Sequence, residues 1–208
     1  MTLTRRTSSA LAALTLALGS GLGLAGCSSD DDKPGGTGTL EGNVATAAGV
    51  SFEIPEGWEA VDPSDLAAGA EGTSELADVA DRLGLEPEAL QQQMAGVDLI
   101  VFSDDVDNPA FRDNVNVTSP GGSVPSEDEL AAQFESFNAT IGEVTSSDTG
   151  VGEAITLTYT FPIQSLTVQG TAIVVEIDGE AVVITVSAAQ ASKAEEVSDD
   201  ILDSLTEA

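Results

Sequence analysis

The chain has 208 residues, of which 36 are acidic, six are basic and none is histidine, so its formal net charge at pH 7 is −30. A chain this acidic does not bind nucleic acid or an anionic membrane surface through its own electrostatic field. Because 41% of the residues are hydrophobic, the composition is that of a folded protein and not of a disordered one.

The first 26 residues have the layout of a secretory signal peptide. Arg5 and Arg6 supply the positive start, and an uncharged core rich in leucine and alanine follows over residues 10–24. A transmembrane helix is the alternative interpretation. An apolar run of 15 residues is short of the roughly 20 that span a bilayer. We therefore expect a signal that is removed.

The stretch Leu24-Ala25-Gly26-Cys27 closes this core and holds the only cysteine. It resembles a bacterial lipobox, in which the cysteine is lipidated and becomes the mature N-terminus. Cleavage without lipidation is the alternative, but it would export an unpaired thiol into an oxidising compartment. Two acyl chains on Cys27 would anchor the protein stably. The prediction is a lipoprotein on the extracytoplasmic face of the cell membrane.

After the signal, residues 27–48 are predicted to be the lipidated cysteine and a flexible tether, and residues 49–208 one folded domain. The tether assignment rests on its Ser, Asp, Gly, Thr and Ala content and its lack of apolar periodicity. All 36 acids but only four basic residues follow Cys27, so the mature net charge is −32. We interpret this charge as an aid to solubility, with a divalent-cation sink as the alternative.

The predicted domain opens with a strand. Val50, Phe52 and Ile54 alternate with polar residues, and the strand ends at Pro55. Trp58 follows in a turn. We interpret this single tryptophan as a core residue in preference to a ligand-stacking one.

Two further strands are predicted in the middle of the chain. Residues 97–102 are apolar enough to be covered on both faces. Residues 113–118 alternate between valine and asparagine, which predicts a strand with its valines inward and with Asn114 and Asn116 on the opposite, outward side.

Four helices are predicted. The first two cover residues 74–83 and a stretch that begins at Pro87. The third begins at a capping box formed by Ser126 and Glu129, and the fourth begins at Ser192. The apolar positions of the third and fourth helices, which we assign to the core, are Leu130, Phe134 and Phe137, then Val197, Ile201 and Leu205.

Residues 141–161 predict one or two strands interrupted near residues 148–150. Residues 166–177 and 180–187 predict a hairpin, because Asp178-Gly179 is a two-residue turn that tolerates positive φ at both positions. Val174 and Val183 lie in runs that are too continuously apolar for a sheet with one solvent-exposed face, so we expect a helix to cover each side. The order of elements predicts an α+β fold with a mostly antiparallel sheet sandwiched between helices.

Four segments together resemble a known family: Phe52–Trp58, Phe111–Val117, the Asp178-Gly179 hairpin and Asp200–Leu205. They are similar to the LpqN-type lipoproteins of actinobacteria, members of the Mog1/PsbP-like superfamily, from Gly49 to the C-terminus. The resemblance implies an α/β/α sandwich that serves as a binding or assembly module. It implies no shared catalytic residues.

The residue types argue against catalysis. Histidine-based triads and acid–base chemistry are excluded because the chain has no histidine. Lipidation of Cys27 would remove thiol chemistry and cysteine-ligated zinc. Lys33 and Lys193 are poor partners for a serine nucleophile, and paired carboxylates are expected by chance among so many acids. The prediction is a protein that is not an enzyme and has no cofactor.

One acidic stretch is a weak candidate for a metal site. Asp104, Asp105 and Asp107 begin like a calcium loop, but Ala110 stands where the glycine of the sharp turn belongs. Asn116 takes the place of the closing glutamate. We interpret the stretch as a solvated acidic loop.

The sequence therefore predicts a lipid-anchored, non-enzymatic binding module at the cell envelope. Its expected partner is an envelope or extracellular protein, or a small apolar ligand. The alternative function is calcium binding through the loop that begins at Asp104.

Overall fold

The computed structural model describes residues 38–61, 96–104, 111–163 and 166–208. These ranges hold two helices, α4 (Glu127–Ser136) and α5 (Ala191–Ser204). Neither helix is long and apolar enough to cross a membrane. The four-stranded sheet has the order β1 (Thr39–Glu41), β2 (Val44–Ala47), β3 (Val50–Glu53), β11 (Thr206–Glu207). The seven-stranded sheet has the order β4 (Glu59–Val61), β5 (Val97–Phe102), β6 (Asn114–Thr118), β10 (Glu180–Ala188), β9 (Leu166–Ile177), β8 (Gly152–Ile163), β7 (Thr140–Thr149).

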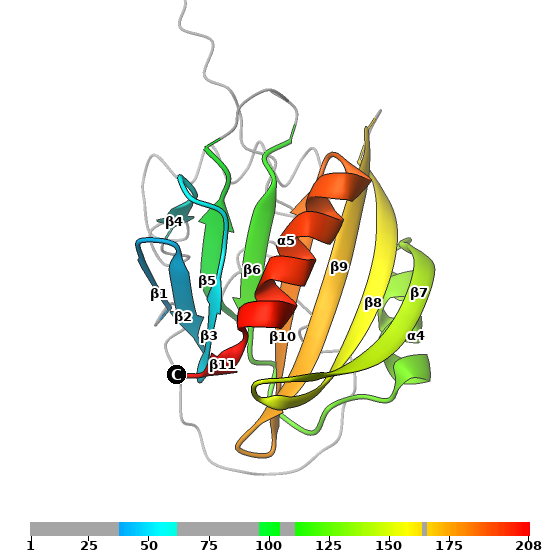
Figure 1. Cartoon of the computed structure of the whole chain (residues 1–208). Helices are drawn as coiled ribbons and strands as arrows, with labels where there is room; N and C mark the ends of the chain where they lie inside the picture. Colours follow the sequence, from blue (N-terminus) through cyan, green and yellow to red (C-terminus); the bar gives the residue numbers. More distant parts are fainter. Residues whose placement is uncertain (1–37, 62–95, 105–110, 164–165) are drawn as a thin grey trace, which may run out of the picture.

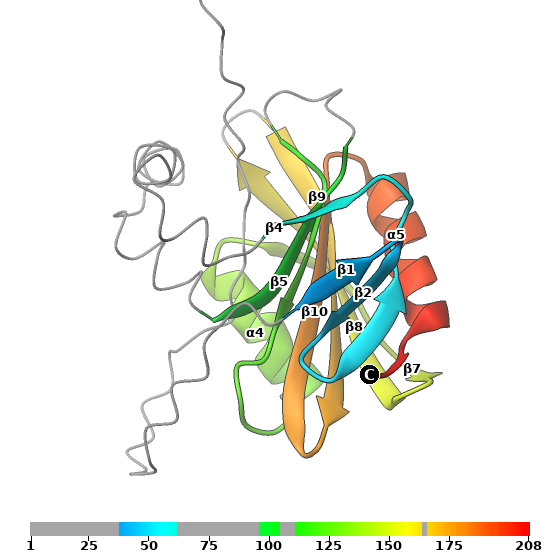
Figure 2. The ribbon, with the colours of Figure 1, turned by 90° about the vertical axis from the view of Figure 1, so that its left-hand side faces the viewer.

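Every strand pairing is antiparallel, and the α+β class is confirmed. In Figure 2 the helices α5 and α4 lie on opposite sides of the seven-stranded sheet. The helix α5 packs on β9, β10 and β3, whereas α4 packs on β7 and β8. Two apolar clusters result, one on each face of the sheet.

The β9–β10 hairpin forms as the sequence predicts, and it lies in the middle of the large sheet. Asp178 and Gly179 both have positive φ, 54° and 84°, which the two-residue turn requires. Successive β-branched side chains alternate between the two apolar clusters: Ile173 faces the α5 side and Val174 the α4 side. Both are 0% exposed, so the expectation of cover on both faces is confirmed.

Strands are present before residue 49, earlier in the chain than predicted. Residues 27–48 are predicted to be the lipidated cysteine and a tether, but residues 39–41 and 44–47 are strands β1 and β2. Both strands are short. Their structure comes from pairing, since β1 pairs with β2 and β2 pairs with β3, and apolar periodicity does not predict it. The backbone amide of Gly38 also donates to the carbonyl of Asp98 in β5, at 3.0 Å. The tether boundary at residue 48 is therefore wrong.

The two described helices begin in different ways. The capping box of α4 is confirmed: the Ser126 side chain accepts from the Glu129 amide, and the Glu129 carboxylate accepts from the Ser126 amide at 2.9 Å. Hydrogen bonds from Ser126 hold the pKa of Glu129 below its usual value. The predicted start of α5 at Ser192 is wrong, since the helix begins at Ala191 after Gln190, without a side-chain cap.

The prediction for β6 is wrong in one respect. Val115 and Val117 are buried as expected, but Asn114 and Asn116 are buried too, at 0% and 3% exposed. Their amides satisfy one another in part, because Asn116 Nδ2 donates to Asn114 Oδ1 at 2.9 Å, and Asn114 Nδ2 donates to the Arg112 carbonyl. Alternation of polar and apolar residues therefore does not by itself place the polar side chains in solvent. Polar side chains that hydrogen-bond to each other can be buried.

Other core predictions are confirmed. Phe134, Val183 and Ile201 are at most 2% exposed, and Trp58 is 7% exposed within the cluster on the α5 side. The helices predicted over residues 74–83 and from Pro87, and the signal segment with Cys27, lie outside the described residues.

We predict that Val183→Asp destabilises the protein by about 3 kcal/mol or more, because it buries an unpaired carboxylate. The matched control is Val44→Asp, since Val44 is 38% exposed on β2 and should change stability by no more than about 0.5 kcal/mol. Urea unfolding monitored by the fluorescence of Trp58 measures both. Equal midpoints for Val183→Asp and the parent would contradict the buried position of β10.

Candidate functional site

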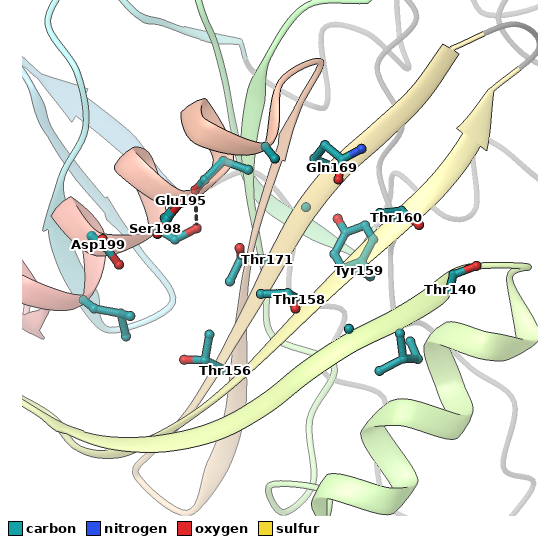
Figure 3. Close-up of a pocket in the computed structure, with 16 residues that line it drawn as sticks. Thr140, Thr156, Thr158, Tyr159, Thr160, Gln169, Thr171, Glu195, Ser198 and Asp199 are labelled. Carbon is teal, nitrogen blue, oxygen red and sulfur yellow. Dashed lines mark hydrogen bonds between the residues drawn. The ribbon is translucent and has the colours of Figure 1, made fainter.

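A groove of about 370 Å³ runs between α5 and the strands β7, β8 and β9. In Figure 1, α5 lies over β9 and β10, and β8 and β7 lie farther along the sheet, beyond the helix. Figure 3 shows the groove with threonines on the strands and acidic side chains on the helix. Its lining residues run from Thr140 to Leu202, 62 positions apart in the sequence, and no local motif connects them.

The floor of the groove is a surface of threonines. Thr156, Thr158 and Thr160 occupy alternate positions on β8, so their side chains share one face of the sheet. Across the strands, Thr158 pairs with Thr171, and Thr160 lies between Thr140 and Gln169. Each threonine offers both a methyl group and a hydroxyl, so the floor presents short apolar and hydrogen-bonding groups side by side.

The wall of the groove is the side of α5 that carries small residues. Ala194 and Ser198 are one helical turn apart and line the groove, whereas Val197 and Ile201 on the adjoining side pack into the core. Small side chains on the helix meet short side chains on the strands, so nothing on either surface fills the space between them. The rim carries the exposed carboxylates of Glu195 and Asp199.

Part of the hydrogen-bonding capacity of the groove is used internally. The register of β7 and β8 shifts between Ile141 and Val144, and Thr158 Oγ1 accepts from the Glu143 amide there at 2.8 Å. Ser198 Oγ donates to the Ala194 carbonyl at 2.6 Å. By contrast, the buried hydroxyl oxygen of Thr156 has no hydrogen-bond partner. That oxygen is closed to solvent, so it is not among the groups that the groove offers to a ligand.

Beneath the floor, Tyr159 packs into the cluster on the α4 side. Its ring lies 4.9 Å from that of Phe134, and its hydroxyl lies 3.1 Å from Ser187 Oγ. Burial raises the pKa of Tyr159 well above its usual value. This phenol stays protonated at physiological pH, so it supplies no phenolate as a base or nucleophile.

The residues singled out in the sequence lie elsewhere. Cys27, Asp105 and Asp107 are outside the described residues, and Asp104 is exposed with its carboxylate beside Gly57. Arg112 lies over the Phe102 ring at 5.4 Å and donates to the Ser103 carbonyl at 2.9 Å. Within residues 38–61, 96–104, 111–163 and 166–208, no group of three or more acidic or cysteine side chains is arranged to hold a metal ion.

A second hollow lies at the other end of α5, between that helix and the strands β2 and β3. Its volume is about 800 Å³, and its lining includes Glu53, Glu56, Asp200 and Asp203. The Ser204 hydroxyl accepts from the Glu53 amide at 2.8 Å and so ties the end of the helix to β3. This hollow is wide, and its charged side chains are all acidic. The hydrogen bond between Ser204 and Glu53 has a structural role.

Sequence reasoning missed the groove. The available signal was the run Thr156-Leu157-Thr158-Tyr159-Thr160, whose alternation marks one face of β8 as polar. The other signal was the pair of small residues at Ala194 and Ser198, four positions apart on the helix. Neither shows by itself that the two surfaces face each other.

We predict that Gly170→Ala destabilises the protein by about 1–3 kcal/mol, because a Cβ at Gly170 would overlap the Tyr159 ring at Cζ. Gly96→Ala is the control, since a Cβ there meets nothing within 4 Å. Thermal unfolding compares the two. The spectrum of Tyr159, the only tyrosine, should change in Gly170→Ala alone, and an unchanged spectrum and Tm would contradict this contact.

No protein-family model matches the chain, and no curated protein matches it. Among solved structures, it is similar to the cyanobacterial PsbP of Synechocystis sp. PCC 6803, with a TM-score of 0.46 and 16% identity over 77% of this chain and 87% of that one. It is also similar to LpqN of Mycobacterium tuberculosis, a protein involved in cell envelope biogenesis, with a TM-score of 0.44 and 10% identity over 76% of this chain and 82% of that one. These are the two kinds of protein that the sequence resemblance names.

Proposed function

We propose that this protein is a lipid-anchored binding module of the cell envelope, and that the groove between α5 and the strands β7–β9 is its binding site. The observation that carries the proposal is the open groove, which the facing surfaces leave unfilled although the same helix packs closely on β10. A groove of about 370 Å³ is within the size range of ligand sites.

The chemistry of the groove favours binding over catalysis. Its lining has hydroxyls, one amide and two carboxylates, together with a tyrosine whose pKa is raised by burial. Hydroxyls without an adjacent base are weak nucleophiles, and the chain has no histidine to act as that base. We propose a partner that hydrogen-bonds to these groups, such as an envelope protein, in preference to a small apolar ligand.

The membrane anchor is the second part of the proposal. It is supported by the order of the N-terminal segment: two arginines, an uncharged core and a single cysteine after small residues. We propose residues 1–26 as a signal peptide, Cys27 as the lipidated mature N-terminus and a folded domain that begins by Gly38. We also propose that the domain is an α/β/α sandwich of the Mog1/PsbP-like kind, which the opposite placement of α4 and α5 supports.

The anchor predicts a mass change at Cys27. In membranes of a bacterial host, the mature protein should begin at Cys27 and carry a diacylglyceryl group, whereas Cys27→Ala should keep its signal segment and lack the lipid. Mass spectrometry of the N-terminal peptide decides between these states. An unmodified Cys27 in protein purified from membranes would contradict the proposed lipid anchor.

The groove is tested by a photo-crosslinking amino acid placed at Thr160, which lines it, and separately at Glu153, an exposed position on the same strand outside it. In intact cells, we expect position 160 to give a discrete adduct that position 153 does not give. Equal adduct patterns from the two positions, or none from either, would count against the groove as the binding site.

A further inference from the structure

The charges at the groove are of one sign. Glu195 and Asp199 stand one helical turn apart on the groove side of α5, both exposed, and no cationic side chain is among the lining residues. Lys193, on the same helix, pairs instead with Glu196 at 3.2 Å. An anionic ligand would meet two uncompensated carboxylates here, whereas a cation would be attracted to them.

The strands of the groove offer hydrogen-bonding groups. Thr171 and Gln169 line it from β9, and Thr140 and Thr160 line it from β7 and β8. A ligand that displaces water from these groups must hydrogen-bond to them, because buried polar atoms without partners are costly. They are independent of the two carboxylates on the helix.

The floor suits a side chain with an aliphatic stem and a charged end. Threonine methyl groups can contact the methylene groups of lysine or arginine, while the cationic end reaches Glu195 or Asp199. The amide of Gln169 both donates and accepts, so it can pair with a peptide group. A small polyamine offers only donors, whereas a polypeptide offers donors and carbonyl acceptors together.

We propose that the groove binds a short lysine- or arginine-bearing segment of a partner polypeptide, with Glu195 and Asp199 as the residues that select the positive charge. This inference rests on the proposed function, because it assigns the occupant of the same groove. The strongly acidic domain would in addition draw such a partner toward it from a distance.

The helix itself provides a matched control. Glu196 and Asp200 directly follow Glu195 and Asp199 in the sequence and are also exposed, but neither lines the groove. The double variants Glu195→Gln/Asp199→Asn and Glu196→Gln/Asp200→Asn therefore remove the same charge from adjacent positions. A difference between them reports on the groove and not on the field of the whole domain.

The probe is a blocked hexapeptide of alternating lysine and serine, titrated by calorimetry into the mature full-length protein in a non-ionic detergent. We expect saturable binding, weakened by added salt, and no binding of the same peptide with glutamate in place of lysine. Glu195→Gln/Asp199→Asn should lose at least tenfold in affinity, and Glu196→Gln/Asp200→Asn less than threefold.

A second pair of variants tests the same inference independently, in case the first pair has a folding defect. Ala191→Lys adds a positive charge to an exposed residue that lines the groove, and Ser192→Lys adds it to the next exposed residue, outside the groove. We expect the first to weaken peptide binding at least fivefold and the second to leave it within twofold. Thermal unfolding of each variant confirms the folded state.

Several results would overturn the inference: no binding of the lysine peptide, equal losses in the two double variants, or equally tight binding of putrescine in place of the peptide. Equal losses would assign the binding to the net charge of the domain. If any of these occurs while position 160 still gives its own adduct in cells, the groove remains the binding site and only the charge of its occupant is wrong. Loss of that adduct as well would overturn both proposals.

Discussion

The structure depends on one hairpin that is buried on both faces. The strands β9 and β10 lie in the middle of the seven-stranded sheet, and their side chains contribute to both apolar clusters. Because Val174 and Val183 face one cluster while Ile173 and Ile184 face the other, shifting either strand by one residue would exchange the two sets. The turn at Asp178-Gly179 fixes that register, and the helices α4 and α5 then have defined surfaces on which to pack.

The hairpin and the helix α4 could be predicted from sequence because their signals are local. A two-residue turn between apolar runs and a serine three positions before a glutamate each identify one conformation. The strands β1, β2 and β11 could not be predicted, since they are short and are held by pairing: β2 and β11 with β3, and β1 with β2. Asn114 and Asn116 were assigned to the wrong environment because their burial depends on what lies across the sheet, which the alternation of polar and apolar residues does not encode.

The groove belongs to the same class of non-local feature. It exists because Ala194 and Ser198 on α5 face Thr158 and Thr171 on the strands, and all four side chains are short. From composition alone, the acidic residues of α5 are interpreted as an exposed surface that aids solubility. Glu195 and Asp199 line the groove, whereas Glu196 pairs with Lys193 and Asp200 lines the second hollow, although each lies only one position away in the sequence.

The contact between Gly38 and Asp98 has a consequence for the reach of the molecule. Only eleven peptide steps separate Cys27 from Gly38 in the sequence, and Gly38 is fixed to β5 by its backbone amide. If Cys27 carries the lipid, full extension of this segment spans at most about 40 Å, whatever its conformation. Gly38 would then stay within that distance of the bilayer surface, and a partner farther out than the domain extends would have to come to it.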